Sequence, residues 1–106
     1  MSKSLWTILV PTKHADTNKL IRVRFHRVWD EKVREITGGL TILHPAKGQW
    51  ISPSGELFAE HMIPVQIMCT KKQIEQIAQM TGKYYKQLAI LYYKITDEVI
   101  IKNVNL

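Results

Sequence analysis

Apolar positions along this chain of 106 residues follow two periods, which alternate from one segment to the next. The run Leu5–Val10 is rich in β-branched and aromatic residues and stops at Pro11, which cannot donate to a ladder, so it predicts a strand. A polar loop extends to about Lys19. Apolar residues then recur every three or four positions from Phe25 to Ile36, and Gly38 with Gly39 ends the pattern, as expected for a helix.

The middle of the chain repeats this order. Leu40–His44 and Met62–Cys69 predict strands, and in the second of these apolar residues alternate along the run. The segment Gly48–Gly55 between them is rich in turn residues and predicts a hairpin extension. Thr70 and Gln73 have the spacing of a capping box, and a second helix is expected to follow. The inner face of that helix is expected to comprise Ile74, Ile77, Ala78, Thr81 and Tyr85.

Two further strands, Gln87–Lys94 and Val99–Asn103, are expected to close the chain on either side of a turn at Thr96–Glu98. The order of elements predicts an α+β, ferredoxin-like (βαββαβ) fold, with two helices on one face of an antiparallel sheet. An extended hairpin joins its second and third strands, and an extra carboxyl-terminal strand follows, which could pair within its own subunit or with a neighbouring one. At this length, residues 1–106 are expected to form a single domain.

The predicted strands are apolar at both even and odd positions. In the first strand Leu5 and Leu9 alternate with Trp6, Ile8 and Val10. A sheet with one face in water should instead alternate apolar with polar residues. A monomer would leave a wide apolar patch exposed, and such patches mark interfaces. We therefore expect a homo-oligomer packed through the open face of the sheet, a trimer in first place and a dimer in second.

The sequence also bears on the cellular location of the protein. No apolar run approaches the roughly 20 residues of a membrane helix, and the amino end lacks the pattern of a signal peptide. We therefore expect a cytoplasmic protein without a membrane partner. Cys69 is the single cysteine, which excludes an intramolecular disulfide.

The net charge of +6 raises the question of nucleic acid. Most lysines are scattered, and only Arg22, Arg24 and Arg27 form a dense basic cluster. An ordinary solvated face is the simpler interpretation, and a surface for phosphate or an acidic partner is the alternative.

The four histidines show no local spacing typical of metal ligands. His44 and His61 could meet Glu60 across the hairpin, but surface or capping histidines are the simpler interpretation. Neither a metal nor a cofactor is expected. The chain also has no phosphate-cradling G-x-x-x-x-G-K-S/T loop, G-x-G-x-x-G fingerprint or catalytic-triad spelling.

The hairpin carries most of the candidate site residues. Trp50 stands outside any apolar stripe, so it is either a stacking wall for a planar ligand or a lid or oligomer contact. Glu56 and Glu60 could hold a cationic ligand group, or they could protect an edge strand from aggregation. Arg24 and His61 complete the candidate ligand-binding set.

In a catalytic function, Glu60 would act as the general base and Tyr85 would be a polar group that assists it. The alternative for Tyr85 is packing in the core with a satisfied hydroxyl.

The spelling Gly48-Gln49-Trp50-x-x-Pro53-x-Gly55, with Glu60 five residues later, resembles an uncharacterised bacterial family of small domains with no assigned function. The order of elements resembles that of the PII signalling and CutA-type proteins, and that of the small phage lyases that cleave S-adenosylmethionine. These resemblances imply trimers of ferredoxin-like subunits with ligands in clefts between subunits. The lyases also imply a glutamate at the interface. Function does not follow from such a fold.

Three functions remain open at this stage. The first is a small oligomeric binding or regulatory module, which holds a small-molecule ligand or a partner near the hairpin at a subunit boundary. The second is an interfacial lyase or hydrolase that uses Glu60. The third is a weak nucleic-acid binder that acts through Arg22, Arg24 and Arg27.

Overall fold

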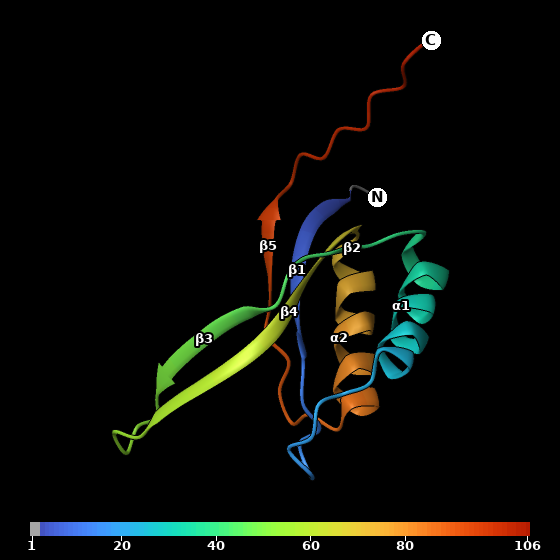
Figure 1. The fold of residues 1–106 in the computed structure, drawn as a ribbon. Coiled ribbons are helices and arrows are strands. Elements are labelled where there is room, and N and C mark those ends of the chain that lie inside the picture. The colour runs from blue at the N-terminus through green and yellow to red at the C-terminus, as the bar shows by residue number, and fades with distance from the viewer. Residues whose placement is uncertain (1–2) are drawn as a thin grey trace.

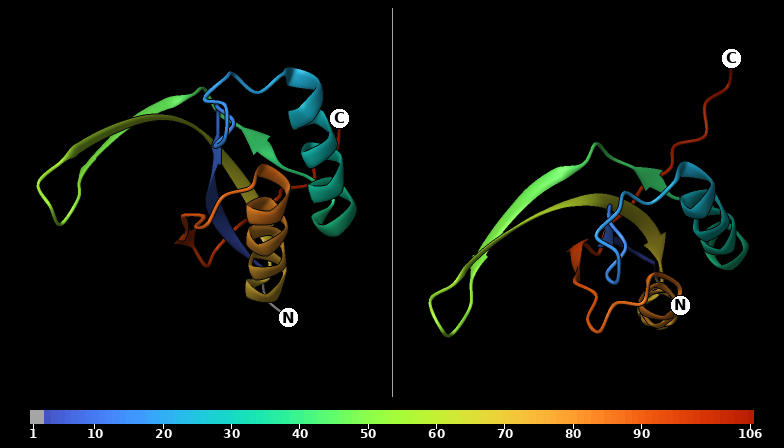
Figure 2. Two further views of the ribbon diagram at one scale, coloured as in Figure 1. Left: turned by 90° about the horizontal axis from the view of Figure 1, so that it is seen from below. Right: turned by 60° about the horizontal axis from the view of Figure 1, so that its bottom comes forward.

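A computed structural model describes residues 3–106, and it has the α+β, ferredoxin-like arrangement that the sequence predicts. The elements are β1 (Ser4–Pro11), α1 (Val23–Thr37), β2 (Thr41–Ile42), β3 (Ala46–Ile51), β4 (Leu57–Cys69), α2 (Lys71–Tyr85) and β5 (Tyr92–Thr96). All strand pairs are antiparallel, in the order β2-β4-β1-β5, and β3 pairs with β4. Both helices lie on the same side of the sheet (Figures 1 and 2).

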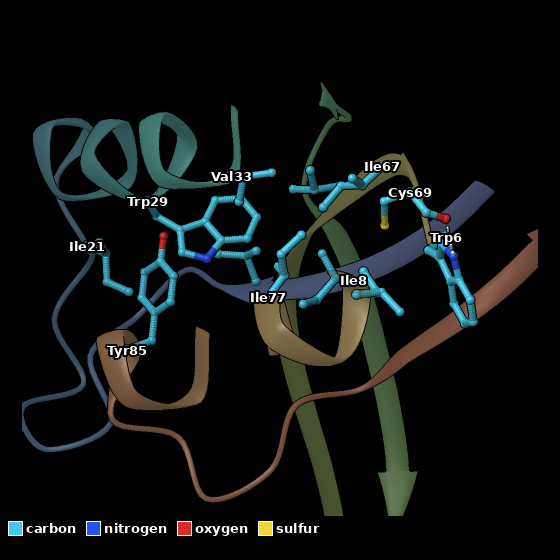
Figure 3. Close-up of a cluster of buried hydrophobic side chains, with 12 residues drawn as sticks. Trp6, Ile8, Ile21, Trp29, Val33, Ile67, Cys69, Ile77 and Tyr85 are labelled. Atoms are coloured by element: carbon cyan, nitrogen blue, oxygen red, sulfur yellow. Dashed lines mark hydrogen bonds between the residues drawn. The ribbon is translucent and has the colours of Figure 1, made fainter. Parts of the chain in front are cut away.

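The core lies between the helices and one face of the sheet. Trp6, Ile8 and Val10 of β1 are buried there, and Ile67 and Val65, the β4 partners of Trp6 and Ile8, are buried beside them. Side chains of α1 and α2 cover this face, as Figure 3 shows for Trp29, Val33 and Ile77. The Trp6 indole donates a hydrogen bond of 3.1 Å to the Cys69 carbonyl, so its only polar atom is satisfied within the core.

The helix ends follow their local sequence signals. Gly38 follows α1 with a φ of 89° and donates its N–H to the Arg34 carbonyl, a left-handed cap that glycine adopts without a steric penalty. Thr70 and Gln73 form the predicted capping box at the start of α2. The Gln73 amide also donates to the Ile36 carbonyl and so ties the start of α2 to the end of α1.

The predicted hairpin extension is confirmed as an arm formed by β3 and the first part of β4. The register with β1 begins at Met62, so residues 57–61 of β4 pair only with β3 among the described strands. The arm leaves the body of the molecule at this point (Figure 1). Between β2 and β3 three residues oppose two of β4, and Pro45 and Pro64, which lack an N–H, lie at this irregularity. The predicted strand Leu40–His44 is therefore reduced to Thr41–Ile42.

The end of the chain differs from the prediction. Residues 87–91 form a loop rather than the start of a strand, because the chain must return from the end of α2 to the edge of the sheet. The loop begins where Lys86 adopts a φ of 55° and Gln87 donates its N–H to the Gly82 carbonyl. Residues 99–103 form no strand within the described chain, so of the two pairings left open for this stretch, the one within its own subunit is not found. This tail leads away from the sheet (Figure 1) and pairs with no strand of residues 3–106.

The second face of the sheet carries no helix of the described chain. Its positions alternate with those of the core, so Leu9 pairs with Pro64 and Leu5 pairs with Met68 across β1 and β4. Tyr93 of β5 lies opposite Thr7 on the same face and is about half exposed. The open face is therefore largely apolar. This agrees with the sequence, in which the strands are apolar at both even and odd positions.

Candidate functional site

A cavity of about 760 Å³, called here the arm pocket, lies where the arm joins the open face of the sheet. Three segments far apart in the sequence form its walls: the arm, the loop that follows β1, and the loop before β5. Its volume falls within the range of small-molecule sites. Among the residues that line it are Leu9, His14, Trp50, Glu60, His61 and Ile90.

Trp50 forms the aromatic wall of the arm pocket. It pairs with Phe58 across the arm, and the two rings stack with centroids 4.6 Å apart at 15°. Trp50 remains 50% exposed despite this contact. The pair therefore presents a flat apolar surface to solvent, which is the geometry that stacks a planar group.

Glu60 and His61 lie beside this wall. Glu60 pairs with Gly48 in the register of the arm, and the Gly48 backbone approaches the Met62 side chain. The His61 carbonyl accepts a hydrogen bond of 2.9 Å from the Thr12 hydroxyl, which fixes the loop after β1 against β4. Lys13 and His14 of that loop line the same cavity, so its polar groups have both signs of charge.

Tyr85 lies outside the arm pocket, so the structure does not bring together the two residues considered for catalysis. Its ring is 2% exposed and packs near Trp29 in the core (Figure 3). Its hydroxyl lies 2.6 Å from His26 Nδ1, and burial raises the pKa of this phenol. Glu60 is exposed in the single chain. The geometry therefore does not favour an enzyme that pairs Glu60 with Tyr85.

Glu56 and Arg24 also lie apart from the arm pocket. Glu56 belongs to the turn at the tip of the arm, where its N–H bonds to the Ser52 hydroxyl. Arg24 lies in the first turn of α1, on the helix side of the sheet. Of the five residues named for binding or catalysis on the hairpin and α1, only Trp50, Glu60 and His61 share one cavity.

No group of three or more histidine, cysteine, aspartate and glutamate side chains within residues 3–106 is arranged to hold a metal ion. None of the helices in this part of the chain is both long and apolar enough to cross a membrane.

The contribution of the two loops to the arm pocket could not be predicted from the sequence. Thr12, Lys13 and His14 come from a polar segment that has no motif, and Ile90 comes from a segment predicted as strand. In this part of the sequence, only Pro11, which ends β1, indicates that the chain leaves the sheet. No periodicity places such loops against an arm some 40 residues away in the sequence.

The sequence matches no protein-family model and no curated protein. Solved structures nevertheless share the fold. The periplasmic divalent cation tolerance protein CutA from Archaeoglobus fulgidus superposes with a TM-score of 0.67 at 11% identity, over 94% of this chain and 88% of that one.

Two other solved structures also share the fold. A phage SAM lyase in complex with S-methyl-5′-thioadenosine has a TM-score of 0.64 at 14% identity and 90% coverage of both chains. The PII-like protein CutA from Nostoc sp. PCC 7120 has a TM-score of 0.57 at 18% identity, over 91% of this chain and 80% of that one. At these identities the likeness extends to the fold alone. The chain has the PII-like, CutA-type ferredoxin-like fold.

Proposed function

We propose that this protein is a small binding module that self-associates through the open face of its sheet and holds a small ligand in the arm pocket. A trimer is the first expectation and a dimer the second. The catalytic and nucleic-acid alternatives have no comparable support. The arm pocket would then lie beside a subunit boundary.

One observation carries this proposal: most large apolar side chains exposed in the described residues gather on the arm, on β5 with the residue before it, and on the tail. On the arm these side chains are Trp50, Ile51, Leu57 and Phe58. On and before β5 they are Leu91, Tyr93 and Ile95, and on the tail they are Ile100, Ile101, Val104 and Leu106. Exposed apolar side chains in such number are typical of interfaces.

Unpaired backbone supports the same conclusion. Residues 57–61 of β4 have a strand on only one side, and the outer edge of β5 has none within the described chain. Open strand edges are templates for pairing with another chain. The tail, with exposed apolar residues and no strand of its own, is suited to such pairing.

Native mass spectrometry of the purified protein tests the self-association. We expect a trimer or dimer at micromolar concentration. Tyr93→Lys places a charge on the open face and should shift the population towards monomer. Leu88→Lys changes a fully exposed residue of the loop before β5, which lies beside residues of α2 rather than on that face, and should leave the assembly intact. A wild-type monomer at this concentration would contradict the proposal.

Calorimetric titration with S-methyl-5′-thioadenosine tests the ligand, since this molecule contains a planar ring and occupies the phage lyase of the same fold. Trp50→Ala should weaken binding, and Ile51→Ala, on the opposite side of the arm, should not. Glu60→Gln should likewise weaken binding more than Glu56→Gln, which changes a residue at the tip of the arm. Equal effects of the two members of either pair would show that the arm pocket is not the binding site.

A further inference from the structure

A second cavity, of about 380 Å³, lies on the helix side of the molecule. The loop before α1, the first turns of α1 and the end of α2 enclose it, so it is called here the α1 pocket. Its volume is at the lower end of the range for small-molecule sites. The residues that matter for its chemistry are Lys19, Leu20, Arg22, Arg24, Phe25 and Tyr84.

The wall of the α1 pocket is aromatic and held in place. Phe25 and Tyr84 stack with ring centroids 4.3 Å apart at 29°, and the Tyr84 hydroxyl donates a hydrogen bond of 2.7 Å to the Phe25 carbonyl. His14 meets Phe25 edge to face at 5.3 Å. A planar apolar group that enters the cavity therefore meets a rigid surface suited to stacking or edge contacts.

Two apolar side chains that line the α1 pocket are exposed to solvent. Leu20 is 72% exposed and Val28 is 42% exposed, and both line the cavity. Each would lose exposed apolar area if a ligand occupied the pocket, and such burial is worth about 25 cal/mol per Å².

The rim is cationic. Lys19, Arg22 and Arg24 are exposed and line the same cavity. The one ion pair within residues 3–106 joins Lys94 and Asp97, so these three cations have no carboxylate partner in the described chain. Arginine presents a planar fork of donors that matches carboxylate, sulfonate and phosphate groups.

The loop beside the cavity is already ordered by backbone hydrogen bonds. His14 donates its N–H to the Lys19 carbonyl, Asn18 donates to the His14 carbonyl, and Ile21 donates to the Thr12 carbonyl, each at 2.9 Å. A ligand would therefore bind without the cost of ordering this segment.

We propose that the α1 pocket binds a small organic anion that joins a planar apolar ring to a carboxylate, sulfonate or phosphate group. The ring lies against Phe25 and Leu20, and the anionic group faces Arg22 and Arg24. Because the site is concave and three segments surround it, we favour a small molecule over an anionic membrane as its ligand. The proposal is independent of the arm pocket.

The test uses the full chain and 8-anilinonaphthalene-1-sulfonate, an aromatic sulfonate whose fluorescence reports binding. The double variant Arg22→Gln/Arg24→Gln removes the rim charges. The matched control Arg27→Gln/Lys32→Gln removes two exposed charges from the same helix outside the cavity. N-phenyl-1-naphthylamine, which has the same rings without the sulfonate, reports what the ring contributes alone. Thermal melting confirms that both variants are folded.

We expect one saturable site for each chain, binding about tenfold weaker in the rim variant and within about twofold of wild type in the control. The uncharged naphthylamine should bind more weakly than the sulfonate. Equal losses in the two double variants, or equal affinity for the two probes, would overturn the proposal. So would the absence of saturable binding. Co-sedimentation of the protein with phosphatidylglycerol vesicles would in that case identify a membrane surface instead.

Discussion

The hydroxyl group of Tyr85 lies 2.6 Å from Nδ1 of His26, and this contact joins the end of α2 to the first turns of α1. The centroids of the two rings are 5.5 Å apart. Burial lowers the pKa of His26 and raises that of Tyr85. Both groups are therefore neutral near pH 7, and the pair is a structural hydrogen bond between the helices.

Acid is expected to destabilise the fold through His26. The pKa of His26 is lower in the folded chain than its ordinary value of 6.5, so the unfolded chain binds more protons between the two values. The free energy of unfolding should therefore rise with pH through this window and reach its full value above about pH 6.5. Asp30, whose pKa burial raises, acts in the opposite sense at more acidic pH.

Urea denaturation from pH 5 to pH 8 measures this dependence. The variant His26→Gln should show a flatter dependence, and His44→Gln, which changes an exposed histidine, should retain the wild-type slope. An unchanged slope in His26→Gln would assign the pH dependence to other groups.

Thr81 is the polar centre of the contact between the helices. It accepts a hydrogen bond of 2.9 Å from the Trp29 indole and donates one of 2.6 Å to the Ile77 carbonyl, with all three residues buried. Thr81→Val keeps the shape but leaves the indole N–H without an acceptor, which should cost about 1–3 kcal/mol of unfolding free energy. Thr41→Val on the exposed strand β2 should change it by less than about 0.5 kcal/mol. Chemical denaturation followed by tryptophan fluorescence decides between these outcomes.

The adjacent glycines after α1 should respond differently to alanine. Gly38 has a φ of 89°, whereas Gly39 has no positive φ, and a Cβ at either position would meet open space. Gly38→Ala should therefore destabilise the fold by about 1 kcal/mol through backbone strain alone. Gly39→Ala should be neutral or stabilising by up to about 1 kcal/mol, because it restricts the unfolded chain. Equal melting temperatures for the two variants would contradict this assignment.

The Cys69 thiol should be unreactive in the folded protein. It is fully buried, and burial raises its pKa to about 11, so little thiolate exists at pH 8. Ellman's reagent should react slowly with native protein and rapidly in 6 M guanidinium chloride. Rapid reaction of native protein at pH 8 would show that β4 opens locally at its carboxyl end.

The elements themselves were largely predictable because their signals are local. The capping box at Thr70, the stop at Gly38 and the inner face of α2 at Ile74, Ile77, Thr81 and Tyr85 all agree with the structure. The alternation over Met62–Cys69 also correctly placed a central strand. Each of these features depends on neighbours within about one helical turn or one strand.

At the carboxyl-terminal tail, local composition did not predict the structure. Val99–Asn103 has the composition of a strand, but a strand also needs an edge to pair with, and within residues 3–106 this stretch pairs with none. Gln87 has strand-compatible neighbours, yet it lies in the turn that the left-handed conformation of Lys86 begins. Strand formation depends on a partner that composition does not specify.

By itself the sequence determined the order of the elements, their caps and the apolar character of both faces of the strands, since periodicity and turn chemistry act over a few residues. Only the tertiary structure decided which polar groups meet. It brought Trp50, Glu60 and His61 to the loop after β1, and it placed Tyr85 in the core beside His26. The physical reason is that such meetings depend on how distant segments cross the sheet, and packing of the whole core selects that crossing.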